Sequence, residues 1–508
     1  MRAILKATVG VAWLGLSFCA GQSEAGQSGM GQTGLSQSGA EVTPPPLDPT
    51  APWVQAGDPA AVARVIRNAG VQAALATTAR TAATFFTRHG YPGMAVAITY
   101  DQHLIFSAGY GVADLGTRQA VTPRTPFRLA SISKLFTALA ILQLRDAGKL
   151  SLDDKVSAHL PGFRLAGDPT PAITIRELLL QLGGLPREPL SASWQERSMP
   201  DGERLMADLA RQPQAIPRET EWKYSNLGYA LLGRLVAAVS HENFADYVRT
   251  HITRPLGMDQ TTVDPDPAPG LATGYGEANS PRPARPVMAM AGVAGAAGVV
   301  STAADLAKFA DFFLAGHDSP VLSRASRREM MRVQAIFPTW NGGQGLGFEL
   351  RRINGRDRIG HAGLGAGYAG RLDLDPRAGL GVVILMNADE GGATTLADGI
   401  FSELLNPLAT AEAAETPPPI ADPAWQAFVG RYTSDGHQSE IALVGGRLCW
   451  QDPEAADPAR TRVFLEPVGS DRFRFLSGAL VGEILRFDFG PNGRVTAMRA
   501  AGATDRKL

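Results

Sequence analysis

The chain has 508 residues, a formal net charge of −1 and 44% hydrophobic residues, which is the composition of a folded protein. One hydrophobic core seldom serves more than roughly 250–300 residues, so at least two domains are expected. The near-zero charge gives no overall attraction to nucleic acid, and the only two cysteines, Cys19 and Cys449, exclude a disulfide scaffold and a cysteine-rich zinc site.

The N-terminal segment has the pattern of a secretory signal peptide, predicted over residues 1–25. Arg2 and Lys6 precede a short apolar run that ends in small residues near Ala20. Because that run is shorter than the roughly 18 residues that cross a bilayer, no stable membrane span is expected. We therefore expect export to the bacterial periplasm or the extracellular space.

The N-terminal region has two further features, a cysteine at the end of the apolar run and a long polar segment after it. Cys19 follows Leu16-Ser17-Phe18, a faint lipoprotein signal, but Phe18 is bulky for the position before the cysteine, so lipidation is the less favoured alternative. Residues 26–58 are rich in Gly, Gln, Ser and Pro and are predicted to form a disordered tether.

After this tether, the sequence has patterns typical of helices and strands. A helical pattern runs from Val62 to about Thr87, and a long apolar helix is predicted from Ser131 to Ala147, closed by Gly148. The other predicted elements are strands at 93–100, 104–111, 347–354, 368–375 and 380–387 and helices at about 174–182, 228–240, 243–253 and 303–315, the last with Thr302 and Asp305 as a capping box. Strands flank a central helical block, which predicts an α+β domain over 59–408 whose sheet is built from both ends.

The C-terminal segment shows a different periodicity. After a predicted linker at 409–421, apolar and polar residues alternate in short runs such as 440–443, 472–475 and 485–489. About six short antiparallel strands are expected over 422–508, forming a small barrel or sandwich without a catalytic cluster of its own.

The first candidate site is Ser131-Ile132-Ser133-Lys134, at the start of the long apolar helix. Ser131 and Lys134 lie three residues apart and so share one helix face. A serine hydroxyl needs a base before it can attack, and the positive end of a helix disfavours the lysine ammonium. Ser131 is thus a candidate nucleophile and Lys134 its proton acceptor; the alternative is a capping serine followed by a surface lysine.

The second candidate is Tyr224-Ser225-Asn226, just before the helical pattern at 228–240. A tyrosinate can accept a proton from Ser131 if a nearby cation lowers its pKa. The Asn226 amide can hydrogen-bond a substrate carbonyl and Lys134. The alternative is a tyrosine packed at a helix entrance with Asn226 as a local cap.

The third candidate is His361-Ala362-Gly363, which precedes a glycine-rich run and a strand. Glycine in a strand lets another backbone approach closely. The backbone N–H of Leu364 is expected to complete an oxyanion hole with that of Ser131. The alternative is a hairpin loop with a solvent-facing His361.

These three motifs, in this order, resemble the class C β-lactamase-like and penicillin-binding-protein-like serine hydrolases. The resemblance covers roughly residues 80–405 and extends to four further stretches, 127–130, 173–179, 255–258 and 301–306. It implies a β-lactamase/transpeptidase-like domain, with an antiparallel sheet flanked by helices plus an all-helical subdomain. The C-terminal segment is similar to the lipocalin-like barrel appended to some members.

The resemblance also implies roles for the candidate residues. Ser131 is the acylated nucleophile, Lys134 its proton partner and Tyr224 the general base. Asn226 binds the amide of the acyl group. His361 and Gly363 line the opposite strand. Together with the Leu364 N–H expected from the third motif, the predicted substrate-binding residues are Asn226, His361, Gly363 and Leu364. No metal and no organic cofactor is implied.

Two departures from the family pattern stand out. His361-Ala362 occupies the place of a Lys-Thr pair, which removes a fixed cation and a hydroxyl, weakens carboxylate recognition and points to peptidase or esterase relatives. Residues 181–184 read Gln-Leu-Gly-Gly where members often have His-Thr-Ser-Gly; we assign this segment no chemistry. A class A arrangement, with a glutamate near an asparagine, is not matched by Glu188-Pro189-Leu190-Ser191, and a G-x-S-x-G elbow is absent.

The sequence therefore predicts a serine hydrolase that acts through an acyl-enzyme on a small-molecule or peptide substrate. A small ester, a D-amino-acid peptide and a β-lactam all stay open as substrates, and so does the oligomeric state. The alternative is a weak or inactive envelope binding protein on the same scaffold, with the barrel as its ligand module. A further possibility is that the barrel shapes the entrance for substrate.

Overall fold

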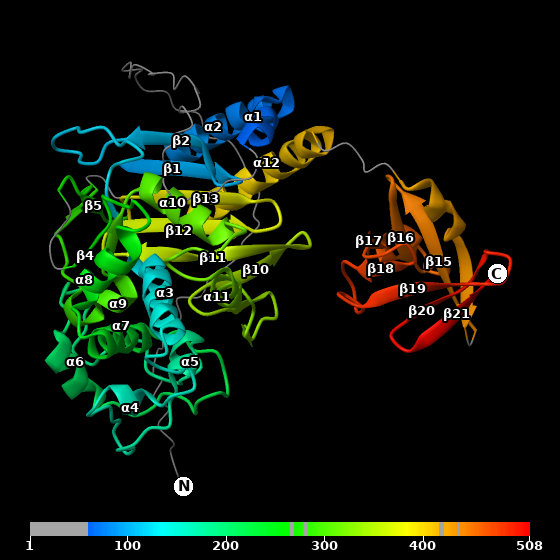
Figure 1. The fold of residues 1–508 in the computed structure, drawn as a ribbon. Coiled ribbons are helices and arrows are strands. Elements are labelled where there is room, and N and C mark those ends of the chain that lie inside the picture. Colours follow the sequence, from blue (N-terminus) through cyan, green and yellow to red (C-terminus); the bar gives the residue numbers. More distant parts are fainter. Residues whose placement is uncertain (1–58, 265–268, 278–281, 416–420, 435) are drawn as a thin grey trace, which may run out of the picture. The chain divides into compact units, whose positions relative to one another are not determined.

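The computed structural model describes residues 59–264, 269–277, 282–415, 421–434 and 436–508 (Figure 1). The predicted signal peptide at 1–25, Cys19 and the predicted tether at 26–58 lie outside these residues. Within the described ranges, no helix has the length and apolar character needed to cross a bilayer.

The first helical pattern forms two helices instead of one. α1 (Pro59–Arg67) and α2 (Ala69–His89) are separated at Asn68, whose side chain accepts a hydrogen bond from the backbone N–H of Gly70. Because such a side chain satisfies a free N–H at a helix start, Asn68 begins a new helix where the periodicity alone suggested continuity.

A single antiparallel sheet forms the centre of the N-terminal domain, in the order β2-β1-β13-β12-β11-β10-β9-β8 (Figure 1). β1 pairs with β13 from Met94–Met386 to Tyr100–Leu380, so the two ends of the domain meet in the middle of the sheet, as predicted. The strands are β1 (Gly93–Tyr100), β2 (His103–Gly111), β8 (Ala335–Ile336), β9 (Gly342–Gln344), β10 (Glu349–Ile353), β11 (Arg356–Gly365), β12 (Tyr368–Asp375) and β13 (Leu380–Met386).

Both faces of this sheet are buried, because successive strand residues point to opposite sides. Val96 and Ile98 of β1 pack in one core with α1, α2 and α12 (Ala393–Glu415), whereas Ala95 and Ala97 belong to a second core with α3 (Ser133–Asp146) and α10 (Ala303–Leu314). The sheet therefore separates a helical layer on one face from the helical block on the other.

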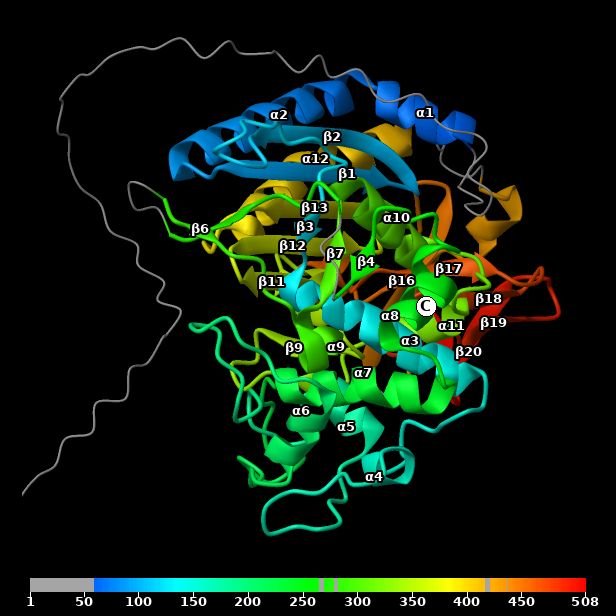
Figure 2. The same ribbon diagram turned by 90° about the vertical axis from the view of Figure 1, so that its left-hand side faces the viewer.

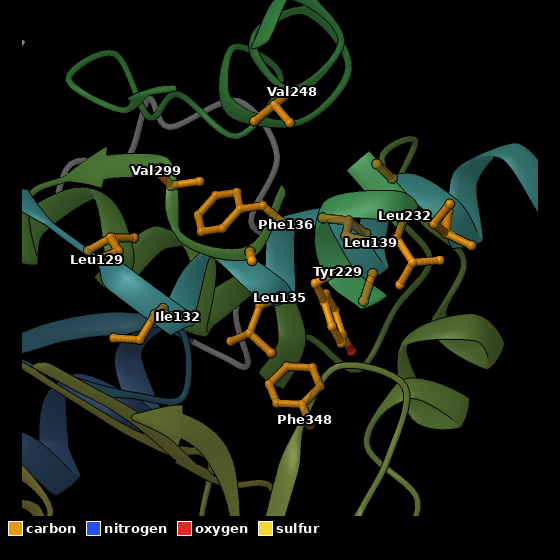
Figure 3. Packing of buried hydrophobic residues seen from close by; sticks show 14 of the residues in the cluster. Leu129, Ile132, Leu135, Phe136, Leu139, Tyr229, Leu232, Val248, Val299 and Phe348 are labelled. Atoms are coloured by element: carbon orange, nitrogen blue, oxygen red, sulfur yellow. The ribbon is translucent and has the colours of Figure 1, made fainter. Parts of the chain in front are cut away.

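The helical block surrounds α3, which lies between the sheet and α7 (Asn226–Ser240) in both views (Figures 1 and 2). Leu135, Phe136 and Leu139 of α3 are fully buried among residues of α7 and β7 and beside Phe348 (Figure 3). The remaining elements are α4 (Val156–His159), α5 (Ile175–Leu179), α6 (Gly202–Leu209), α8 (Phe244–Val248), η2 (Arg249–Thr253), η3 (Ala291–Val293), α9 (Ala294–Ala297), α11 (Arg324–Met330) and the short strands β3 (Phe127–Arg128), β4 (Thr262–Val263), β5 (Gly274–Tyr275), β6 (Ala284–Arg285) and β7 (Val299–Ser301).

The predicted capping box at Thr302 is only half present. The Thr302 side chain accepts from the backbone N–H of Asp305, but Asp305 accepts from Gln260 and Thr261 instead of reaching back to the cap. The Asp305 carboxylate, which the local pattern assigned to the helix start, therefore binds a neighbouring segment instead.

The C-terminal segment forms a closed antiparallel barrel of eight strands, two more than the sequence indicated. β14 pairs with both β15 and β21, which closes it. The elements are η4 (Pro423–Ala427), β14 (Gly430–Ser434), β15 (His437–Val444), β16 (Arg447–Gln451), α13 (Pro458–Thr461), β17 (Val463–Pro467), β18 (Arg472–Phe475), β19 (Ile484–Phe489), β20 (Val495–Ala500) and β21 (Ala503–Lys507).

Alternate strand residues fill the interior of the barrel. Phe473 and Phe487 are fully buried and both contact the ring of Phe428. The segment before the barrel also differs from the prediction. α12 continues to Glu415, so residues 409–415 of the predicted linker at 409–421 are helical, and Ala411 is buried against the α1–α2 layer. An alanine-rich run has high helix propensity, which the linker interpretation overlooked.

Candidate active site

Ser131 lies on a tight turn directly before α3. The turn is the 3₁₀ helix η1 (Ala130–Ile132), and Ala130 adopts a left-handed backbone with φ of 45°. A residue with a side chain seldom adopts this conformation, which costs of order 1–3 kcal/mol and is found most often at functional sites. α3 begins at Ser133, so the prediction that Ser131 opens the long helix was two residues early.

Lys134 is completely buried and its amine is directed at Ser131. Nζ lies 3.1 Å from Ser131 Oγ, 2.7 Å from Asn226 Oδ1 and 3.1 Å from the carbonyl oxygen of Ala296. Burial lowers the pKa of Lys134 to about 7, an effect that outweighs the opposing pull of Glu188 and Glu349. The cause is desolvation more than the helix end invoked from the sequence.

The partners of this amine fix where its lone pair points. Asn226 Oδ1 and the Ala296 carbonyl can only accept hydrogen bonds, and a neutral amine has two N–H groups to give them. The third direction, toward Ser131 Oγ, is therefore left to the lone pair. A neutral Lys134 is thus arranged to accept the serine proton.

Tyr224 contacts the same serine from another side. Its hydroxyl donates to Ser131 Oγ at 2.6 Å, and its ring lies beneath Lys134 Nζ, 4.8 Å from the ring centroid. Burial raises the pKa of Tyr224 well above its usual value, and the hydrogen bond to Ser131 offsets this only in part. A tyrosinate, which the sequence interpretation required, is therefore disfavoured, and the phenol is held neutral.

Gln181 holds the Tyr224 segment in place. Its side-chain oxygen accepts from the backbone N–H of Ser225 at 2.8 Å, and its own carbonyl accepts from Lys223 at 2.9 Å. Ser225, and not Asn226, caps α7 by accepting from Gly228. The segment 181–184, to which the sequence analysis assigned no chemistry, thus brackets the tyrosine from both sides.

Asn226 is buried, with 4% of its surface exposed, and both ends of its amide are occupied. Oδ1 accepts from Lys134, and Nδ2 donates to Glu188 Oε1 at 2.6 Å. Nδ2 carries a second N–H group besides the one that faces Glu188, so the contact of Asn226 with a substrate carbonyl stays a prediction. The structure also places Glu188 beside an asparagine, an arrangement that the local sequence around Glu188 does not predict. The two residues are 38 positions apart and meet only through the fold.

Gly363 brings β11 against the turn that carries Ser131. A Cβ at this position would overlap the Leu129 carbonyl oxygen and lie 3.5 Å from Ala130 Cβ. Only glycine permits this approach. Leu364 follows on the same strand, with 57% of its surface exposed.

His361 belongs to the same strand but is buried, with 2% exposed, so the alternative of a solvent-facing loop histidine is wrong. Its Nδ1 lies 2.6 Å from the carbonyl oxygen of Ala362, and its Nε2 lies 3.9 Å from Glu349. Burial lowers the pKa of His361, which keeps the ring neutral at pH 7. Positions 361 and 362 of this strand therefore carry no fixed cation.

Comparison with known proteins now assigns the family. The Beta-lactamase family model matches residues 65–404. The chain belongs to the β-lactamase family of serine hydrolases. Penicillin-binding protein 4 of Amycolatopsis lactamdurans is 33% identical over 353 residues, which cover 66% of this chain and 91% of that protein.

Two solved structures share the fold of this β-lactamase-family protein. The octameric penicillin-binding protein homologue from Pyrococcus abyssi has a TM-score of 0.57 at 22% identity, covering 85% of this chain and 99% of that chain. EstCE1, a hydrolase with promiscuous acyltransferase activity, has a TM-score of 0.57 at 23% identity, covering 65% of this chain and 98% of that chain.

This family member has no group of three or more His, Cys, Asp or Glu side chains arranged to hold a metal ion among its described residues. The atoms that meet at Ser131 are a lysine amine and a tyrosine hydroxyl, with an asparagine amide behind them. This arrangement can move a proton off a hydroxyl and back to a leaving group by side chains alone.

Proposed function

We propose that this protein is an active serine hydrolase that cleaves esters or amides through an acyl-enzyme on Ser131. The observation that carries the proposal is the geometry at Ser131 Oγ, which has Lys134 Nζ at 3.1 Å and Tyr224 Oη at 2.6 Å. A hydroxyl held between an amine with a free lone pair and a neutral phenol has both a proton acceptor and a proton donor within reach.

The acylation step follows from these contacts. Ser131 Oγ attacks the substrate carbonyl while its proton passes to Lys134, and the carbonyl π electrons move onto oxygen. We assign the backbone N–H groups of Ser131 and Leu364 as the donors to this oxyanion. When the intermediate collapses, the leaving group takes a proton from the Tyr224 hydroxyl, which recovers one from the Lys134 ammonium.

Deacylation uses the same groups in reverse. A water molecule gives its proton to Lys134, directly or through Tyr224, and its oxygen attacks the acyl carbon. The bond between that carbon and Ser131 Oγ then breaks, and the serine recovers its proton. Apart from substrate and water, no group beyond Ser131, Lys134 and Tyr224 is needed to balance the proton transfers in either step.

The finer choice of substrate follows from charge. His361 is neutral and buried and Ala362 has no hydroxyl, so these two positions of β11 offer no fixed cation for a substrate carboxylate. We therefore propose neutral esters and D-amino-acyl amides as the preferred substrates, ahead of penicillins, whose carboxylate would lack a partner on this strand.

Labelling with a fluorescent fluorophosphonate tests the role of Ser131, and turnover of a p-nitrophenyl ester, a D-amino-acyl amide and nitrocefin tests the substrate class. Wild-type protein should be labelled and should cleave the ester and the amide faster than nitrocefin, whereas Ser131→Ala should do neither. Ser151→Ala, a change of the same type at an exposed position, is the matched control. Equal labelling of wild type and Ser131→Ala would reject the proposal.

The alternative of a non-catalytic binding protein has less support. A binder has no need for a buried lysine of lowered pKa directed at a serine. The interior of the barrel, its suggested ligand module, is filled by aromatic side chains such as Phe473 and Phe487. Turnover of an alkyl ester that falls about 10–10²-fold in Tyr224→Phe would count against a binding role.

We further propose that the protein is exported after removal of residues 1–25, on the basis of the N-terminal sequence pattern. Mass spectrometry of the protein recovered from cell fractions of a bacterial host would test this. A periplasmic or secreted form that begins after Ala20 or Ala25 is expected, and an intact cytoplasmic form or a lipid-modified Cys19 would contradict it.

A further inference from the structure

Glu188 stands at the end of a hydrogen-bonded chain that leads to the nucleophile. Its Oε1 accepts from Asn226 Nδ2 at 2.6 Å, Asn226 Oδ1 accepts from Lys134 Nζ at 2.7 Å, and Lys134 Nζ lies 3.1 Å from Ser131 Oγ. The acyl-transfer steps described above use Lys134 but give Glu188 no part.

This carboxylate decides which way the asparagine amide faces. An amide has one end that donates and one that accepts, and a carboxylate only accepts, so the end facing Glu188 must be Nδ2. Oδ1 is then turned toward Lys134. If the amide were reversed, its NH₂ group would face the amine, compete for the lone pair and remove one of the two acceptors that direct it toward Ser131.

The segment that carries Glu188 is fixed to the start of α7. The Arg187 carbonyl accepts from the backbone N–H groups of Asn226 and Leu227 at 2.8 and 3.2 Å, and the Glu188 carbonyl accepts from Gln212 Nε2 at 2.9 Å. These backbone hydrogen bonds thus hold the Glu188 carboxylate beside the Asn226 amide. Its second oxygen, Oε2, is buried without a hydrogen-bond partner among the described residues, and the Arg187 guanidinium approaches Oε1 only to 3.6 Å.

We propose that Glu188 is a positioning residue, which fixes the Asn226 amide and thereby aims the lone pair of Lys134 at Ser131. This inference rests on the proposed hydrolase function and adds a group that touches neither substrate nor the reacting atoms. The negative charge of Glu188 has a second effect, because it favours the ammonium form of the lysine two hydrogen bonds away.

Several titratable groups face Lys134 and together influence its pKa. Among the described residues these are Glu188 and Arg187 from the loop before α6, Tyr224 and Tyr229 from the α7 region, Glu349 from β10 and His361 from β11. Glu188 and Glu349 raise the pKa of Lys134 and Arg187 lowers it, while burial is the larger effect. Removing the charge of Glu188 therefore lowers the pKa of Lys134 further.

Two substitutions separate orientation from charge. Glu188→Gln keeps an oxygen that accepts from Asn226 but removes the charge, so the acidic limb of the kcat/KM profile should move to lower pH by about one unit, with the maximum within about threefold of wild type. Glu188→Ala removes the acceptor, so kcat should fall about 10–100-fold while KM changes less than about threefold. Glu196→Gln, the same charge change at an exposed position, is the matched control and should shift neither.

A crystal structure of Glu188→Ala gives a readout that does not depend on activity. Loss of the contact between Asn226 Oδ1 and Lys134 Nζ is expected, and an unchanged contact would overturn the inference even if the enzyme proves inactive. A wild type that is not labelled at Ser131 would instead overturn the proposed function. An unshifted acidic limb in Glu188→Gln would overturn the charge effect, and a kcat of Glu188→Ala within about threefold of wild type would overturn the positioning role. Acyl-enzyme that accumulates in Glu188→Gln would show a role in deacylation and would also overturn the inference.

Discussion

The Ser131 site and the C-terminal barrel bury different kinds of side chain. The site buries Lys134, Asn226 and His361 beside its apolar residues, whereas the barrel core consists mainly of aromatic and aliphatic side chains such as Phe473 and Phe487. Buried polar groups destabilise a fold unless each finds a partner, so they persist where they have another role.

The contrast extends to the backbone. At the Ser131 site, Ala130 has a left-handed backbone, which costs free energy that packing elsewhere must compensate. Gly363 lets β11 lie against the same turn. The barrel closes by regular antiparallel pairing of neighbouring strands. We therefore expect substitutions at the Ser131 site to change activity more than stability, and substitutions in the barrel core to change stability more than activity.

The largest effect is expected from Lys134→Met, which keeps the length of the side chain and removes the base. The rate of ester cleavage should fall at least about 10³-fold, because proton removal from Ser131 then has no acceptor. Steady-state kinetics would measure this, with circular dichroism to confirm folding. A loss of less than tenfold in a folded variant would mean that another group is the base.

Gly363→Ala should follow with a loss of about 10²-fold. The added methyl group overlaps the Leu129 carbonyl oxygen and must push β11 away from the Ser131 turn, which displaces the oxyanion donors. Gly399→Ala, at a helix position where an added Cβ meets nothing within 4 Å, is the matched control. Equal kinetics for the two variants would contradict the close approach of β11.

Tyr224→Phe should lower kcat by about 10–10²-fold, since the leaving group loses its proton donor while Lys134 can still activate the serine. Leaving groups of low pKa should be affected least, because they depart without a proton. Comparing a p-nitrophenyl ester with an alkyl ester of the same acid measures this. An equal loss on both esters would argue that Tyr224 acts by some other route.

The pH profile distinguishes Lys134 from Tyr224 as the base. The pKa of Lys134 is lowered to about 7, so the neutral amine is lost as the pH falls through 7, and kcat/KM should drop about tenfold for each further pH unit. The pKa of Tyr224 is raised, so its phenol stays protonated at pH 9 and the profile should be level there. A rate that climbs steadily through pH 10 would favour a tyrosinate base.

The smallest effect on activity is expected from Phe487→Ala in the barrel. This change should lower the stability of the barrel by about 3–5 kcal/mol, because it leaves a cavity among Phe428, Tyr432 and Phe473. Ester cleavage at 25 °C should stay within about twofold of wild type. A large loss of activity with unchanged stability would reverse the comparison and support a role for the barrel in substrate access.

Much of the fold could be predicted from the sequence, where local pattern and burial agree. The apolar runs at 93–100 and 380–387 become central strands, and the apolar helix after Ser131 becomes α3. The prediction failed where a single polar residue outweighs the periodicity, as at Asn68, and where an alanine-rich helix end was interpreted as a linker. Strand number in the barrel was underestimated because several strands are too short for a clear alternation.

The S-x-x-K spacing places Ser131 and Lys134 on one turn without help from the rest of the chain, so local sequence was enough to predict this pair. Tertiary structure alone decided their protonation and their partners. Burial, which lowers the pKa of Lys134 and raises that of Tyr224, depends on elements far apart in the chain. The same holds for Glu188 and Gln181, whose contacts with residues around 225 form only when distant segments pack together, since a side chain's environment is set by its neighbours in space.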